Sequence, residues 1–164
     1  MNGRYILSID GTGYFSSHEI HCDQCCQKNH RDGSITYHHQ MLGAVLVNPD
    51  FKEVIPFAPE PIKKQDGVKK NDCERNAVKR LLEDFRREHP HLKVIVVEDG
   101  LASNAPHIQL LKKLNMEFIL GAKKDDHKFL FELTHDSPNT KHHTITQNGV
   151  THEFKFINNV SLNK

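Results

Sequence analysis

Two apolar segments that end in acid are the clearest feature of the hydrophobic pattern. The first spans residues 4–10 and ends at Asp10, and the second spans residues 93–99 and ends at Asp99. The second contains four consecutive apolar residues, which is typical of a central strand buried on both faces of a parallel sheet. Open α/β sheets place their chemistry at the ends of such strands. If the two strands are parallel neighbours, the two aspartates lie close together.

Alternating and short apolar runs predict further strands. We expect them over residues 34–48, 53–58 and 117–120. Pro56 cannot donate a ladder hydrogen bond, so the strand over 53–58 should lie at an edge. The dipeptide Asn148-Gly149 between two alternating segments predicts a hairpin over residues 142–157. The polar residues 11–33 predict a loop or a long irregular hairpin.

Helical periodicity predicts three helices. The first spans residues 72–89, with its apolar residues on one face and its charges on the other. The second begins at Asn104 and has Pro106 in its first turn, where proline is tolerated. The third is short, and Asp125 and Asp126 can cap it.

The predicted order of elements is β-β-β-α-β-α-β, followed by a helix and a hairpin. This order predicts a single α/β domain over residues 1–164, with a loop insertion at 11–33. We expect a central mixed sheet of five strands in the order 3-2-1-4-5, flanked by helices. This is the arrangement of the ribonuclease-H-like fold.

Composition narrows the range of functions. The formal net charge is +1, so the chain as a whole lacks the basic character of a general nucleic-acid binder. Its longest apolar runs are too short to cross a bilayer, and its first residues have no signal-peptide character. A cytoplasmic protein without membrane association is therefore expected. Two basic pairs, in or just after a loop at residues 59–67, either track a phosphate backbone or only solvate the surface. These pairs are Lys63-Lys64 and Lys69-Lys70.

Several sequence stretches together resemble the catalytic core of the DDE transposases of bacterial insertion sequences, over nearly all of the chain. They are Ile9-Asp10-Gly11-Thr12, the stretch from Tyr37 to Val45, the stretch from Asn71 to Ala77, and the stretch from Val96 to Asn104. The resemblance implies DNA cleavage and strand transfer with Mg²⁺ or Mn²⁺. It implies Asp10 and Asp99 as two of three acidic ligands, transposon ends and target DNA as partners, and a homo-oligomer as a candidate assembly.

The third acidic ligand of that family lies on a later helix. Here Glu132 is the only well-placed glutamate on a predicted helix, and Glu153 lies in the hairpin. We therefore expect the third ligand beyond Lys164, in which case this chain is an incomplete core. Two alternatives stay open: a metal-dependent nuclease of the same fold, and a truncated transposase that binds DNA or partners without cutting. Asp10 and Asp99 also have simpler interpretations, as a turn residue and a loop cap.

Glu74 has two interpretations. With Asn71 it has the spacing of a capping box at the start of a helix. In the related ribonucleases H, however, a glutamate from this helix is a metal ligand. Glu74 is therefore also a candidate ligand beside Asp10 and Asp99.

A second candidate metal site lies in the polar segment. Cys22, Cys25 and His30 have the spacing of a zinc knuckle, and His38 or His39 could supply a fourth ligand. His18, His21 and Cys26 increase the density of candidate ligands there. The alternative is a reduced, metal-free loop, since disulfides are rare in cytoplasmic proteins. Cys73, on the apolar helix face, is expected in the core.

Overall fold

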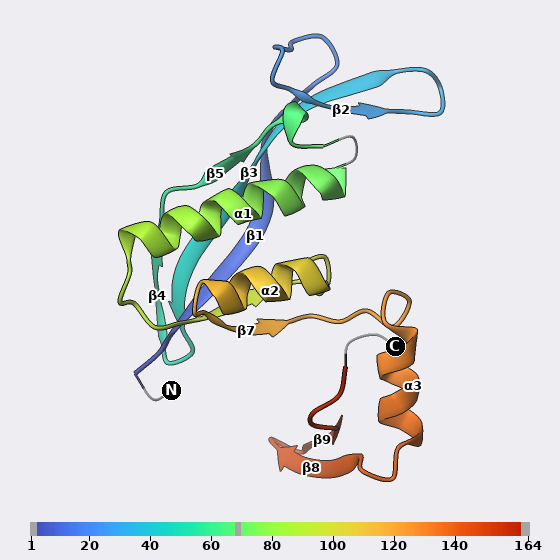
Figure 1. Cartoon of the computed structure of the whole chain (residues 1–164). Coiled ribbons are helices and arrows are strands. Elements are labelled where there is room, and N and C mark those ends of the chain that lie inside the picture. Colours follow the sequence, from blue (N-terminus) through green and yellow to red (C-terminus); the bar gives the residue numbers. More distant parts are fainter. Residues whose placement is uncertain (1–2, 68–69, 162–164) are drawn as a thin grey trace. The chain divides into compact units, whose positions relative to one another are not determined.

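The computed structural model describes residues 3–67 and 70–161 (Figure 1). The chain divides into two compact units, Met1–Gly121 and Ala122–Lys164, where the sequence predicts a single domain. Unit 1 has an α/β architecture with a mixed sheet, and unit 2 consists of a helix and a hairpin. Each unit is described separately below.

Unit 1 is built on a sheet of seven strands in the described part of the chain. They are β1 (Tyr5–Ser17), β2 (Cys26–Asn29), β3 (Ile35–Asn48), β4 (Phe51–Pro56), β5 (Glu60–Ile62), β6 (Val94–Glu98) and β7 (Glu117–Leu120). The order is β2-β3-β1-β6-β7, and β4 and β5 also pair with β3. Pairings with β3 are antiparallel, whereas β1 with β6 and β6 with β7 are parallel.

The five predicted strands occur in the predicted relative order, β4-β3-β1-β6-β7. Two further strands, β2 and β5, were not predicted. Residues 11–33, predicted as a loop or a long irregular hairpin, are not a loop throughout, because β1 continues to Ser17 and β2 begins at Cys26. The long β3 offers partners to both segments, and this tertiary pairing overrides their polar composition. A bulge between Gly13 and Phe15 inserts one residue into the β1–β3 ladder.

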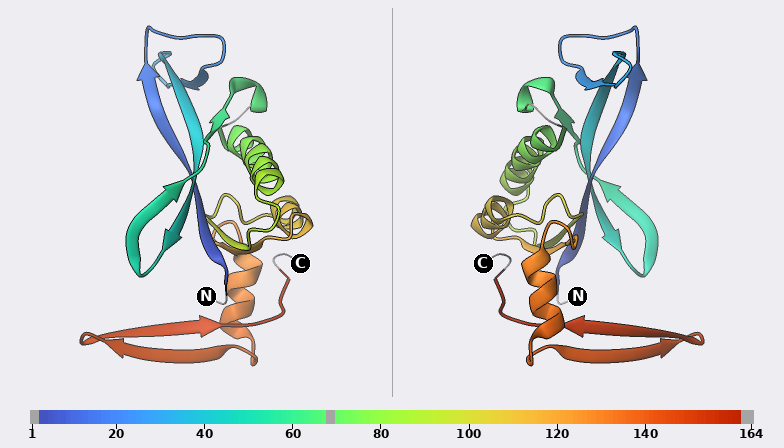
Figure 2. Two further views of the ribbon diagram at one scale, coloured as in Figure 1. Left: turned by 90° about the vertical axis from the view of Figure 1, so that its left-hand side faces the viewer. Right: turned by 90° about the vertical axis from the view of Figure 1, so that its right-hand side faces the viewer.

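The two helices of unit 1 cover one face of the sheet (Figure 2). They are α1 (Lys70–Glu88) and α2 (Ala105–Lys113), and a short 3-10 turn, η1 (Lys64–Asp66), precedes α1. The core between α1 and the sheet is apolar, and Leu7, Leu82 and Val96 are fully buried. The sequence prediction that β6 is buried on both faces is wrong, since Ile95 and Val97 are only half-buried. In the described residues of unit 1, helices cover only the face to which Val96 points.

The start of α2 agrees with the local signal in the sequence. Asn104 caps α2 by accepting a hydrogen bond from the His107 amide at 3.1 Å, as its position before Pro106 predicts.

Among the described residues, no helix combines the length and apolar character needed to cross a membrane.

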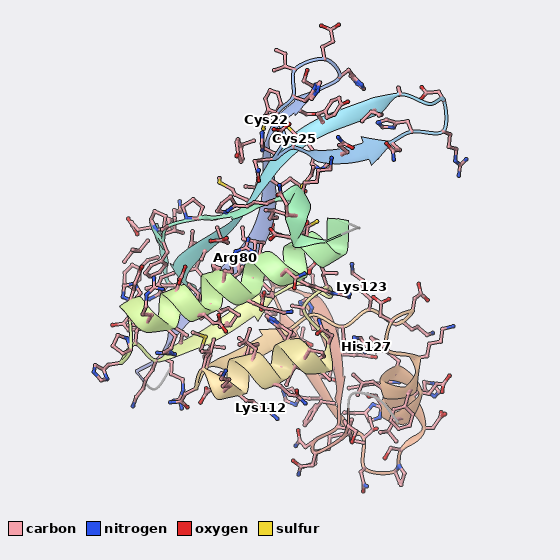
Figure 3. The ribbon with its side chains drawn as sticks, turned by 45° about the horizontal axis from the view of Figure 1, so that its top comes forward. Cys22, Cys25, Arg80, Lys112, Lys123 and His127 are labelled. Carbon is pink, nitrogen blue, oxygen red and sulfur yellow. The ribbon has the colours of Figure 1, made fainter. Side chains whose placement is uncertain are left out.

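Arg80 of α1 joins the helix to the β5–η1 segment (Figure 3). Its guanidinium donates to Glu60 at 2.6 Å and to both carboxylate oxygens of Asp66 at 2.7 and 3.0 Å. The Asp66 side chain is only 9% exposed. Burial raises the pKa of Asp66, but hydrogen bonds from Arg80 and the Lys63 amide outweigh burial and lower it below the ordinary value of 3.8.

Replacing Arg80 by methionine should lower the free energy of unfolding by about 2 kcal/mol at pH 7, because Asp66 then loses its charged partner. Since the folded pKa of Asp66 is lowered, its stabilising contribution is present above pH 3.8 and disappears as the pH falls through the folded pKa. The difference between variant and wild type should therefore shrink below pH 3.8 in urea unfolding.

Arg87→Met is the matched control for this prediction. Arg87 lies on the same helix and pairs with Asp84 at 2.5 Å, but its side chain is 68% exposed. Exposed ion pairs contribute at most about 1 kcal/mol, so this variant should unfold nearly like the wild type. An equal loss of stability in both variants would contradict the role given to the buried Asp66 contact.

Unit 2 contains α3 (Lys128–Asp136) and a hairpin of β8 (Lys141–Gln147) and β9 (Val150–Phe156). Asn148 and Gly149 have φ angles of 51° and 75°, the positive values that a two-residue hairpin turn requires. The predicted hairpin is thereby confirmed. The prediction that Asp125 and Asp126 cap the helix is wrong, because the N-cap residue is His127, without a side-chain capping bond.

Candidate functional site

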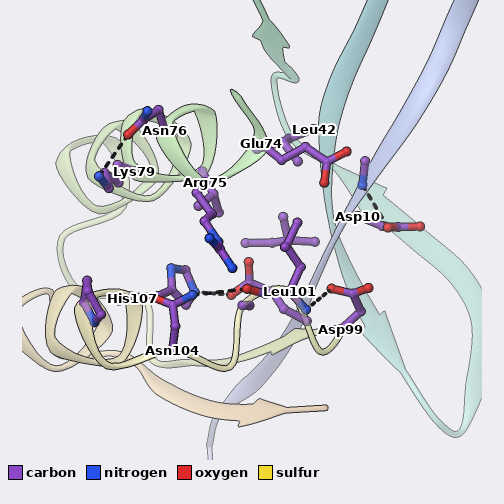
Figure 4. Close-up of a pocket in the computed structure, with 16 residues that line it drawn as sticks. Asp10, Leu42, Glu74, Arg75, Asn76, Lys79, Asp99, Leu101, Asn104 and His107 are labelled. Atoms are coloured by element: carbon purple, nitrogen blue, oxygen red, sulfur yellow. Dashed lines mark hydrogen bonds and ion pairs between the residues drawn. The ribbon is translucent and has the colours of Figure 1, made fainter. Parts of the chain in front are cut away.

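The parallel pairing of β1 with β6 brings the two acid-terminated strands together. Tyr5 pairs with Val94 and Ser8 pairs with Val97, so Asp10 and Asp99 follow the last of these pairs by two residues on each strand. Both aspartates border one cavity of about 580 Å³ in unit 1 (Figure 4). The structure thus places both just beyond the same end of the β1–β6 ladder. The prediction that Asp10 ends the first strand is wrong, because β1 continues to Ser17 along β3.

The two aspartates are exposed and each also shapes its own backbone. The Asp10 carboxylate accepts a hydrogen bond from the Gly11 amide at 2.8 Å, and the Asp99 carboxylate accepts one from the Leu101 amide at 2.8 Å. The simpler roles of turn residue and loop cap are therefore fulfilled. Each carboxylate has a second oxygen that is available to a ligand, since an ionised carboxylate has about four acceptor sites.

Glu74 approaches the same strand from α1. A Cβ atom built on Gly11 would lie 3.4 Å from the Glu74 Oε1 atom, so this carboxylate lies beside the residue that follows Asp10. Glu74 also borders the cavity. The capping-box interpretation loses support, because α1 begins at Lys70 and Asn71 lies inside the helix. Figure 4 shows Asp10, Glu74 and Asp99 on one side of the view and His107 on the other.

The three carboxylates surround the cavity without converging on one point. Among the described residues, Asp10, Glu74 and Asp99 do not form a group whose ligand atoms all lie within 4.8 Å of one another. The wall of the cavity therefore offers several separate oxygen donors.

A buried acid–imidazole pair also lines the cavity. Glu98, the last residue of β6, contacts His107 of α2 with 2.5 Å between Oε2 and Nε2, and the side chains are 7% and 6% exposed. Asn104 caps the same helix and donates to the Leu101 carbonyl at 3.1 Å. These contacts fix α2 against the loop that carries Asp99. His107 was not among the residues predicted for the site, although its position three residues after the cap Asn104 places it in the first turn of α2.

The backbone that carries Asp99 is fixed from the other side by Gly121. The Gly121 amide donates to the Glu98 carbonyl at 3.0 Å. A Cβ atom at position 121 would lie 3.1 Å from the Gly100 nitrogen, which leaves no room for a larger residue without a backbone shift. The strand that ends in Asp99 is thus held in place by a close backbone approach.

Among the described residues that line the cavity, Arg75 and Lys79 of α1 are basic. Neither was predicted as a DNA-binding residue from the sequence. Lys79 donates to Asn76 at 2.9 Å. Of the predicted DNA-binding lysines, Lys63 and Lys64 are exposed and are not among the residues that line this cavity. Lys69 and the side chain of Lys70 lie outside the described residues.

A second candidate site joins the loop after β1 to the strand β3. Cys22, Cys25 and His39, the thiol–imidazole cluster, have ligand atoms that all lie within 4.8 Å of one another, so the cluster could hold a metal ion. The two sulfurs are 3.7 Å apart, and the His39 Nε2 atom lies 3.4 Å from Cys22 Sγ and 3.2 Å from Cys25 Sγ. All the cysteines are free thiols.

The predicted ligand His30 is not brought to the cysteines. Its Nε2 atom lies 2.7 Å from the Thr36 hydroxyl, across the turn between β2 and β3. The spacing of a zinc knuckle favours His30, but pairing of β3 with β1 brings His39 to the thiols instead. His38 points to the opposite face of β3 because side chains alternate along a strand. Cys73 is buried in the core, as predicted.

The remaining acids of the sequence prediction lie in unit 2. Glu132 is exposed on α3, and Glu153 is exposed on β9. Neither is among the residues that line the cavity of unit 1. Of the glutamates that the sequence offered as candidate ligands, Glu74 is the one that lines the cavity together with the two aspartates.

No family model, no curated protein and no solved structure matches this chain significantly.

Proposed function

We propose that unit 1 is a ribonuclease-H-like catalytic core that cleaves and joins DNA strands with a divalent metal ion, as DDE transposases do. One observation carries the proposal: Asp10 and Asp99, just beyond the last pair of the parallel β1–β6 ladder, border one cavity together with Glu74 of α1. The resemblance of the sequence around these residues to the transposase core supports the same function.

The donor set of the cavity fits Mg²⁺ or Mn²⁺. Both ions prefer carboxylate oxygen, and Mg²⁺ keeps several waters, so one or two carboxylates are enough to hold it. Because the three carboxylates do not converge on one point, one or two of Asp10, Asp99 and Glu74 would hold each ion. When bound, such an ion stabilises the negative charge that develops on the attacking and leaving oxygens of a phosphodiester.

The other residues of the cavity fit a phosphodiester substrate. Arg75 is exposed at the rim and can donate two parallel hydrogen bonds to one phosphate. The exposure of Asp10 and Asp99 leaves them accessible to a polymer that cannot enter a closed pocket. The buried contact between Glu98 and His107 keeps the Asp99 loop and α2 at a fixed separation. Since the chain has a net charge of only +1, DNA binding should be weak, and it should fall with salt because local basic residues must supply the phosphate contacts.

A hydrolytic nuclease is the second candidate, and the position of Glu74 favours it. Ribonucleases H take a metal ligand from the corresponding helix, and here the Glu74 carboxylate lies beside Gly11. A complete set of ligands within unit 1 would support strand cleavage without the later glutamate of the transposases.

The test is a combined nicking and joining assay with the full chain. Nicking is measured as relaxation of supercoiled plasmid. Joining is measured as transfer of a labelled duplex with a free 3′-hydroxyl into the plasmid, and the sequence of this duplex is that of the DNA flanking the gene. Joining that requires Mg²⁺ or Mn²⁺ supports the transposase, whereas metal-dependent nicking alone supports the nuclease. Absence of both activities, with either ion and with correctly folded protein, would contradict a catalytic function.

A further inference from the structure

The thiol–imidazole cluster, at the far end of the β1–β3 hairpin, is not explained by phosphodiester chemistry. Cys22 and Cys25 lie in the loop between β1 and β2, and His39 lies fourteen residues after Cys25 on β3. Figure 3 shows the two cysteines close together in this loop. Cys25 is 1% exposed although it lies in a loop of mostly exposed residues. The contact between this buried thiol of the loop and the imidazole of β3 needs a structural explanation.

We propose that Cys22, Cys25 and His39 bind one zinc ion, with a water molecule as the fourth ligand. In tetrahedral zinc sites the Zn–S distance is about 2.3 Å and the Zn–N distance about 2.0 Å, so two sulfurs lie about 3.8 Å apart and sulfur and nitrogen about 3.5 Å apart. The corresponding distances in the cluster are 3.7 Å between the sulfurs, and 3.4 and 3.2 Å from sulfur to nitrogen. The three atoms thus already form one face of such a tetrahedron.

The ligand types select zinc over the ions proposed for the acidic cavity. Thiolate sulfur is a soft ligand that favours zinc, whereas Mg²⁺ and Mn²⁺ favour carboxylates and water. Binding converts two thiols into thiolates and releases two protons to the solvent, so zinc affinity should rise with pH. The Cys22 amide lies 3.3 Å from Cys25 Sγ and donates to it, which stabilises negative charge on that sulfur.

The surroundings hold His39 in place and separate it from the neighbouring candidates. Its ring is stacked on the Tyr14 ring and tilted against the Phe15 ring, with 5.8 Å between ring centroids in each pair. Cys26 lies outside the cluster, because its sulfur donates to the Ile62 carbonyl at 3.8 Å. Because Cys22 is exposed, solvent has access to the fourth position.

The proposed ion would tie the loop to the sheet. The loop from His18 to Cys25 is otherwise held by hydrogen bonds from the Glu19 and Ile20 amides to Ser17 Oγ and by two contacts with β3. His18 Nδ1 lies 3.1 Å from the Ile35 carbonyl oxygen, and the His21 ring stacks on Tyr37. A zinc ion links this loop to β3 across fourteen to seventeen residues of sequence. The loop should then resist proteolysis when zinc is bound.

The first experiment uses the wild-type full chain, reduced and then dialysed against zinc. We expect about one zinc ion per chain by elemental analysis. Alkylation followed by mass spectrometry should show Cys22 and Cys25 protected with zinc and modified after chelation. A reduced, folded wild-type chain that takes up no zinc and leaves both thiols reactive would overturn the proposal. So would recovery of these cysteines only as a disulfide under conditions that keep Cys26 and Cys73 reduced.

The second experiment tests the ligand set by substitution. His39→Ala and Cys22→Ser should each lower zinc affinity more than about hundredfold, since even partners outside the ligand shell typically contribute tenfold to hundredfold. His38→Ala and His30→Ala are the matched controls and should keep wild-type affinity, which competition with a chromophoric chelator measures. Wild-type affinity in His39→Ala, or loss of zinc in His30→Ala, would overturn the assignment. None of these four substitutions lies among the residues that line the cavity of Asp10 and Asp99, so the result is independent of the nicking and joining assay.

Discussion

Replacing Asp10 or Asp99 by asparagine should lower the rate of metal-dependent DNA cleavage by at least about hundredfold, the typical effect of losing one electrostatic contribution to a transition state. Asparagine keeps the size of the side chain and one oxygen that can accept the Gly11 or Leu101 amide. It removes the negative charge that a divalent ion needs. Initial rates of plasmid nicking at saturating Mg²⁺ measure the effect.

Glu53→Gln is the matched control for this prediction. Glu53 is an exposed acid on β4 and is not among the residues that line the cavity, so the same change of charge should leave the rate unaltered. Glu74→Gln tests whether Glu74 holds the ion, because cleavage should slow under either candidate function if it does. Wild-type cleavage by Asp10→Asn and Asp99→Asn, with unchanged circular dichroism, would refute the proposed catalytic site.

His107→Ala should lower the free energy of unfolding by about 3 kcal/mol, because it removes the buried partner of Glu98. The two side chains are 6% and 7% exposed, so water cannot replace the lost contact without opening the cavity wall. The substitution also shortens a buried residue in the first turn of α2. Urea unfolding followed by circular dichroism gives the difference.

An exposed histidine serves as the control for this measurement. His91→Ala, in the turn after α1, should change stability by less than about 0.5 kcal/mol. The double variant Glu98→Gln/His107→Ala should be more stable than the sum of the single effects predicts, since the buried charge is then removed together with its partner. Strict additivity of the two substitutions would show that the contact between Glu98 and His107 contributes little.

Sequence patterns predicted those parts of the fold that depend on local signals. The apolar run before Asp99, the cap at Asn104 and the Asn148-Gly149 turn each carry their signal within a few residues, and each element was found. The relative order of the five predicted strands followed from the succession of elements along the chain. Strands β2 and β5 were missed because they are short and carry no apolar alternation, and because β3 supplies their hydrogen-bond partners.

The candidate site was predictable to the extent that strand ends determine it. Asp10 and Asp99 follow apolar runs, so their placement could be anticipated once the strands were taken as parallel neighbours. The approach of Glu74 to Gly11 depends on how α1 packs on β1, which spacing alone does not reveal. The change from His30 to His39 as the imidazole of the cluster has the same cause, since the β1–β3 register decides which histidine meets the thiols.

The bulge in the β1–β3 ladder has a consequence for how the chain folds. Asp10 lies opposite Gly43, and His39 is four residues away along β3, about 13 Å at the usual rise per residue. Tyr14 is the extra residue between these two points, and loss of the bulge would slip the register beyond it by one residue and turn that part of the ladder to the wrong face. Misregistered hairpins are therefore near competitors of the native one during folding. An ion on the thiol–imidazole cluster would favour the one register that also keeps Asp10 opposite Gly43, so metal supply and correct folding speed would be linked.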